Sequence, residues 1–115
     1  MATGVPVTHG LLDAPHFAMG GAIFGPIKPD HVEMTARLGF PAIELYRSQS
    51  MAWLDRVGEL KRIFDQNGLA LVTCSNGGAG QSCEFIDSSQ REQTLADHVA
   101  FAREFLAPFG CKHFK

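Results

Sequence analysis

The sequence has few cysteines, no marked excess of charge of either sign and no long apolar run. Ten lysines and arginines against twelve acidic residues give a net charge of −2, which offers no basic field to nucleic-acid phosphates or anionic lipids. No stretch approaches the roughly 18 consecutive apolar residues of a membrane span, and the first 15 residues lack the pattern of a secretory signal. We therefore expect neither a nucleic-acid nor a membrane partner.

The three cysteines have no C-x-x-C spacing, which argues against a disulfide framework and against a cysteine-based zinc site. A reducing, cytoplasmic location is then the default expectation. The 115 residues are 45% hydrophobic and 19% charged, a composition typical of one globular domain. We expect residues 1–15 to form a flexible N-terminal tail and residues 16–115 to form the domain.

Three glycines each separate a helix-like stretch from an apolar run. The segments read RLG–FPAIEL, QNG–LALVTC and PFG–CKHFK, and the glycines are Gly39, Gly68 and Gly110. A glycine just past the last turn commonly ends a helix because it adopts the left-handed conformation without a Cβ clash. An apolar run that follows directly indicates a buried strand. A further strand is predicted in HFAMGGAIF, residues 16–24.

The stretches between these strands predict amphipathic helices, the first beginning near Pro29. The second has one apolar stripe, formed by Trp53, Val57, Leu60 and Phe64. The third begins with a possible capping box, Ser89 and Glu92. Its predicted core stripe consists of Leu95, Val99, Ala102, Leu106 and Phe109.

Strands that alternate with helices predict an α/β fold with parallel pairing through right-handed crossovers. The chain accounts for about three βα units plus the start of a fourth parallel strand at its last residues. A strand needs neighbours on its open edge. We therefore expect either that this sequence is the first part of something longer or that a partner completes its sheet.

The glycine-rich stretch CSNGGAGQSC, residues 74–83, follows the third strand. It lacks the G-x-x-x-x-G-K-[ST] pattern, and its glycines come too early for a dinucleotide fingerprint, which places them at the turn into a helix. We expect a loop that shapes or covers a pocket. Its expected members are Asn76, Gly77, Gly78 and Gly80.

Two phrases resemble the xylose isomerase-like barrels, the sugar phosphate isomerases and epimerases. HVEMTARLGFPAIELYR resembles the first helix and second strand of that family, and ELKRIFDQNGLALVTCS the second helix and third strand. FAREFLAPFGCKHFK is similar to the family's third helix and fourth strand, so that the resemblance spans most of residues 16–115.

The resemblance implies a (β/α)8 TIM barrel that binds a divalent metal such as Mn, Mg, Co or Zn. Members move a proton between adjacent carbons of a sugar or polyol, and some are instead dehydratases or DNA-repair endonucleases. The family's metal ligands lie on later strands, so the resemblance implies no metal ligand in this chain.

In such barrels the carboxyl ends of the strands build the active site. Glu44 ends the second strand, where it could bind substrate or support the metal site, or could be a structural carboxylate paired with an arginine or a backbone amide. Tyr46 and Arg47 follow it and could contact a ligand or simply line the rim. His113 and Lys115 share one face of the last run and could approach a sugar if that face is the barrel interior. If Phe114 faces inward instead, both are ordinary surface residues.

Two hypotheses of different class follow. The first is the N-terminal part of a metal-dependent sugar or sugar phosphate isomerase or epimerase. The second is a non-catalytic βα scaffold that self-associates or docks a partner through its exposed sheet edge.

Overall fold

The computed structural model describes residues 17–77 and 86–115. The expected tail at residues 1–15 and the expected loop residues Gly78 and Gly80 lie outside the described residues, as do His16 and Cys83.

Three strands form a parallel sheet, as the sequence predicts. The order is β1–β2–β3, which follows the chain, and the strands are β1 (Ala18–Gly20), β2 (Ala42–Tyr46) and β3 (Ala70–Ser75). On the far side of β3 the last residues add an isolated parallel bridge between Cys74 and Phe114. The start of a fourth parallel strand was thus placed correctly.

The first strand is shorter than predicted, because its glycines lead the chain into a turn. The predicted strand covered residues 16–24, but β1 ends at Gly20 and a 3₁₀ turn, Gly21–Phe24, follows. At Gly21 the backbone lies so close to β2 that a Cβ would stand 2.6 Å from the carbonyl oxygen of Glu44. A side chain at that point would clash, so the turn depends on glycine.

Helices connect the strands and end where the glycines predict. They are α2 (Pro29–Arg37), the short α3 (Arg47–Ser50), α4 (Val57–Gln66) and α5 (Arg91–Phe101). The three terminal glycines all have positive φ, at 92° for Gly39, 64° for Gly68 and 68° for Gly110. No helix among the described residues is both long enough and apolar enough to cross a membrane.

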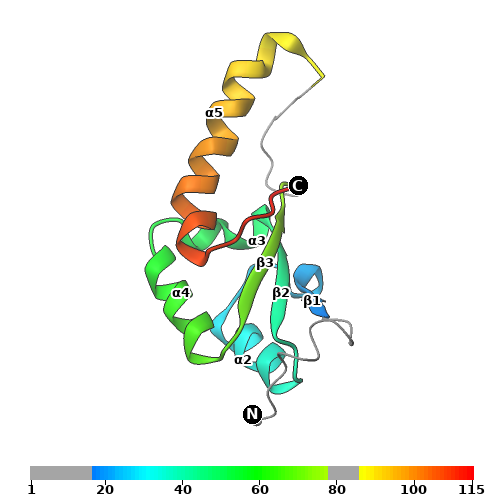
Figure 1. The fold of residues 1–115 in the computed structure, drawn as a ribbon, viewed down its shortest axis with the longest axis vertical. Helices are drawn as coiled ribbons and strands as arrows, with labels where there is room; N and C mark the ends of the chain where they lie inside the picture. The colour runs from blue at the N-terminus through cyan, green and yellow to red at the C-terminus, as the bar shows by residue number, and fades with distance from the viewer. Residues whose placement is uncertain (1–16, 78–85) are drawn as a thin grey trace.

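The core lies between one face of the sheet and the helices (Figure 1). Ile43 and Leu45 of β2 and Leu71 of β3 belong to the same buried cluster as Leu60 and Phe64 of α4. The opposite face of the sheet is more open, since Tyr46 and Val72 remain 41% and 37% exposed. The helices therefore cover one face of the described sheet with an apolar core and leave the other face more open.

The stripe predicted for the third helix is correct in its second half and wrong in its first. Leu106 belongs to the core, and Ala102 and Phe109 pack against it. Leu95 and Val99 of the predicted stripe are 50% and 46% exposed, whereas Thr94, Phe101 and Phe105 are buried. A π-helical turn, Ala102–Leu106, follows α5 and changes the helical period, so a single 3.6-residue stripe cannot run through both segments.

The predicted capping box at the start of this helix is also wrong. Ser88–Gln90 form a 3₁₀ turn, and the cap is Asp87, whose Oδ1 accepts hydrogen bonds from the Ser89 amide at 2.9 Å and the Ser89 hydroxyl at 2.6 Å. These bonds hold the pKa of Asp87 below its usual value. A carboxylate at this position satisfies the free amide of the turn, and it displaces serine from the role.

Candidate functional site

Two of the predicted site residues meet on the open face of the sheet. Lys115 Nζ lies 2.8 Å from Glu44 Oε2, and the side chains are 62% and 29% exposed. Glu44 stands on β2 next to Thr73 of β3, so the pair crosses β3 from the second strand to the fourth. This ion pair defines the candidate site.

The structure decides which face of the last run points toward the site. The Phe114 ring packs against Phe101 and His98 of α5, with centroids 5.3 and 5.1 Å apart. Because neighbouring side chains in extended backbone point to opposite faces, His113 and Lys115 lie on the open face with Glu44. Phe114 therefore points toward the helices, and His113 and Lys115 point toward the other face of the sheet.

The pKa of Lys115 is raised, first by its hydrogen bond with Glu44 and then by the negative charge of that carboxylate. Removal of the ammonium from solvent opposes this increase in pKa, and Tyr46 adds to it. The lysine is thus a firmly protonated cation held beside a carboxylate. Such a pair offers a hydroxylated ligand both a hydrogen-bond acceptor and a charged donor.

His113 contributes its backbone to this arrangement. Its carbonyl oxygen accepts hydrogen bonds from the Cys74 amide at 3.0 Å and the Thr73 hydroxyl at 3.2 Å. Its side chain is exposed. The residue therefore anchors the last run on β3 through its backbone and leaves its imidazole accessible.

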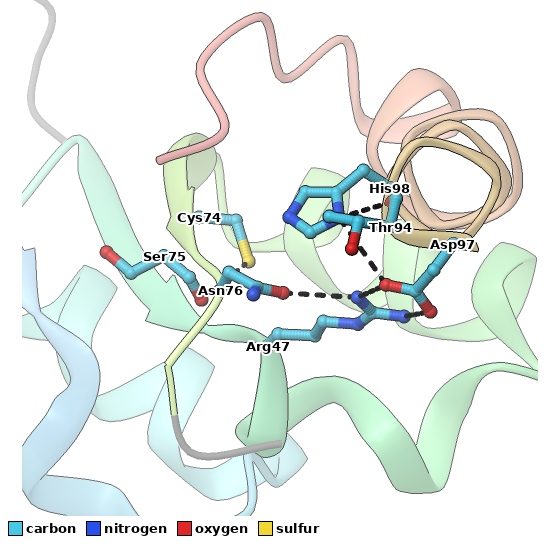
Figure 2. A network of polar contacts seen from close by, with 7 residues as sticks. All are labelled: Arg47, Cys74, Ser75, Asn76, Thr94, Asp97 and His98. Carbon is cyan, nitrogen blue, oxygen red and sulfur yellow. Dashed lines mark hydrogen bonds and ion pairs between the residues drawn. The ribbon is translucent and has the colours of Figure 1, made fainter. Parts of the chain in front are cut away.

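A second polar network surrounds Arg47, directly after β2 (Figure 2). Its guanidinium makes two hydrogen bonds to Asp97 of α5, with Nη1–Oδ2 at 2.6 Å and Nη2–Oδ1 at 2.8 Å. It also lies 4.5 Å from the centre of the Phe101 ring. Only 5% of Arg47 is exposed, so this residue is not the open rim side chain that one of our interpretations supposed.

Asn76 connects the two networks. Its side-chain oxygen accepts a hydrogen bond from Arg47 Nη1 at 3.1 Å, and its backbone amide donates to the carbonyl of Lys115 at 2.6 Å. Asn76 was predicted as a residue of the rim loop, and it follows the carboxyl end of β3. Gly77 is the next described residue of that segment.

Neither described cysteine is suited to nucleophilic chemistry. Burial raises the pKa of Cys74 to about 12, the nearby Cys111 adds to the shift, and Arg47 opposes it. Burial likewise raises the pKa of Cys111. Since the thiolate is the reactive form, both residues act as packed core thiols, as expected for Cys74.

The described residues do not provide a fit for the divalent metal that the resemblance implies. Residues 17–77 and 86–115 contain no group of three or more His, Cys, Asp or Glu side chains that could hold a metal ion. Glu44 has an ammonium group against its carboxylate, whereas Mg²⁺ and Mn²⁺ need several oxygen ligands directed at one point.

Sequence reasoning missed Asp97 and His98. Asp97 pairs with Arg47, and His98 Nδ1 lies 2.9 Å from the carbonyl oxygen of Thr94 and 3.5 Å from Asp97 Oδ2. The only signal was the position of Arg47 at a strand exit, because a buried cation requires an acidic partner. Nothing local identifies which of the twelve acidic residues that partner is.

A scan against protein-family models and searches of curated proteins and of solved structures return no significant match to this chain.

Proposed function

We propose that this chain forms the N-terminal part of a (β/α)8 barrel that acts as a metal-dependent sugar or sugar phosphate isomerase or epimerase. Its contribution to the substrate pocket is the Glu44–Lys115 pair. The observation that carries this proposal is the position of the pair, on the open face of the described sheet near the carboxyl ends of its parallel strands.

The order of the strands supports a barrel over a doubly wound sheet. Successive right-handed crossovers that add each strand beside the previous one place every helix on the same face. A doubly wound sheet reverses its order at a switch point and carries helices on both faces. Here β1, β2, β3 and residues 112–115 follow one another across the sheet, which is the order of a singly wound barrel wall.

The chemistry of the pair suits proton transfer between adjacent carbons of a sugar or polyol. Such a reaction develops negative charge on a carbonyl oxygen, and an ammonium group fixed nearby stabilises that charge. Lys115 would supply this cation, Glu44 would orient it and accept hydrogen bonds from sugar hydroxyls, and His113 would line the same face. Metal ligands would have to come from other parts of the complete barrel.

Replacing Glu44 with glutamine should lower turnover by about 10²-fold, because the oriented charge is lost. Turnover is measured with the complete barrel that contains this chain, as exchange of a sugar carbon-bound hydrogen with solvent deuterium. Proton NMR follows the exchange for a panel of aldoses, ketoses and their phosphates with Mn²⁺ or Mg²⁺ present. Glu59→Gln is the matched control, since Glu59 of α4 pairs at 3.6 Å with Arg56, the residue before that helix, and both side chains are about half exposed. Unfolding free energies should be similar for both variants.

Two results would count against the proposal. Unchanged exchange rates in Glu44→Gln would make Glu44 structural. No exchange by the complete barrel that contains this chain, with any member of the panel, would contradict the proposed reaction.

One observation favours the second candidate, a scaffold that pairs with a second copy of itself. Residues 112–115 make backbone hydrogen bonds to β3 through His113 and Lys115, so the amide and carbonyl of Phe114 alternate to the outer edge. Among the described residues no strand pairs with that edge. An open parallel edge is a template for another strand.

If the scaffold role is correct, the purified chain should sediment at twice its monomer mass, with a fraction that rises with concentration. Sedimentation velocity over a wide range of protein concentration measures this. A monomer at every concentration would contradict self-association.

A further inference from the structure

A continuous series of polar contacts joins helix α5 to the candidate site. Asp97 binds Arg47, Arg47 Nη1 donates to Asn76 Oδ1, the Asn76 amide donates to the Lys115 carbonyl, and Lys115 Nζ pairs with Glu44. The contacts measure 2.6, 3.1, 2.6 and 2.8 Å in that order. The series runs from α5, which packs on the core face of the sheet, to Glu44 and Lys115 on the open face.

Asn76 couples the position of Arg47 to that of Lys115, because its side chain contacts one of these residues and its backbone contacts the other. The side chain is held by Arg47, and the backbone amide holds the carbonyl of Lys115. The amide of Lys115 donates in turn to the Cys74 carbonyl at 2.9 Å. The backbone of Lys115 is therefore fixed on both sides, so the place of its ammonium depends on where Asn76 is held.

Arg47 is fixed by contacts on several sides. Asp97 engages two of its nitrogens, and the Phe101 ring lies against the guanidinium plane. A guanidinium can do this because its five N–H donors form a rigid planar fork, which a lysine ammonium cannot reproduce. Its burial at 5% exposure keeps these contacts from competition with water.

We infer that Arg47 is a positioning residue for the candidate site, which fixes Lys115 through Asn76 and so holds the ammonium against Glu44. The functional importance of this positioning rests on the proposed function. The positioning itself is a property of the chain that can be measured without turnover.

The test measures the pKa of Lys115 from the pH dependence of its ¹³Cε chemical shift in the full 115-residue chain. In Asn76→Ala and in Arg47→Met the pKa should fall toward the ordinary lysine value, because the ammonium leaves Glu44. Glu44→Gln gives the reference for complete loss of the pair. Removal of the Arg47 charge alone would instead raise the Lys115 pKa, since a nearby cation lowers a lysine pKa. A fall therefore reports lost positioning.

Matched controls separate this effect from a general loosening of the fold. Asn67→Ala removes a side chain that donates to the Ile63 carbonyl at 2.9 Å, and Arg56→Met removes an arginine that lies 4.2 Å from the Trp53 ring centre. Neither should change the Lys115 pKa. If Arg47→Met does not fold, Asn76→Ala decides the matter.

An unchanged Lys115 pKa in Asn76→Ala, or an equal fall in Asn67→Ala, would overturn the inference. A fall confined to the Arg47 and Asn76 variants supports it, even if no sugar is turned over. If the complete barrel turns over no sugar, the proposed function fails while the positioning role stands, so the two conclusions are tested separately.

Discussion

Replacing Asp97 with asparagine should lower the free energy of unfolding by about 3 kcal/mol. The change leaves the Arg47 guanidinium buried without its charged partner, and the side chain of Arg47 is only 6% exposed against 26% for Asp97. Breaking a buried pair by removing one partner is costly because the remaining charge has lost its hydration as well as its counter-charge. Urea unfolding followed by circular dichroism measures the difference.

The matched control is Asp65→Asn on α4. Asp65 pairs with Lys61 one helical turn earlier, and its side chain is 60% exposed. A pair of this kind stabilises a helix by only about 0.3–0.5 kcal/mol. If Asp97→Asn costs no more than Asp65→Asn, Arg47 is not held by Asp97 in the way the structure describes.

Replacing Phe105 with alanine should cost about 3–5 kcal/mol, the usual range for a fully buried phenylalanine. The side chain is 0% exposed and its ring stacks on Phe101, with centroids 5.2 Å apart and an interplanar angle of 15°. A second ring, Phe109, lies 5.2 Å away. The lost contacts and the remaining cavity both lower stability, again measured by urea unfolding.

Leu95→Ala is the control, and it tests the orientation of α5 at the same time. Leu95 is 50% exposed, so its truncation should change stability by no more than about 0.5 kcal/mol. The sequence pattern instead placed Leu95 in the core. A large loss from Leu95→Ala with a small one from Phe105→Ala would restore the predicted stripe and refute the observed packing.

The candidate site could be predicted from the sequence in part. Glu44 and Lys115 were both chosen because they lie at the carboxyl ends of predicted strands, and the structure brings them to 2.8 Å. Pairing of that glutamate with the lysine was not foreseen, because the expected structural partner was an arginine or a backbone amide. The partner depends on how far the last run is shifted along β3, which no local pattern encodes.

The sequence by itself determined the helix ends and the parallel α/β order. Gly39, Gly68 and Gly110 act through their own backbone conformation, and each apolar run follows directly in the chain. These signals are local, because a glycine with positive φ ends a helix whatever lies across the core.

Only the tertiary structure decided which faces meet. The orientation of α5 depends on a π-helical turn, and Arg47 finds Asp97 fifty residues along the chain. The face of Lys115 was fixed by Phe114 packing on α5. Contacts between distant segments are selected by the fit and the charge of the packed surfaces, and a periodic pattern within one segment carries no information about its partner.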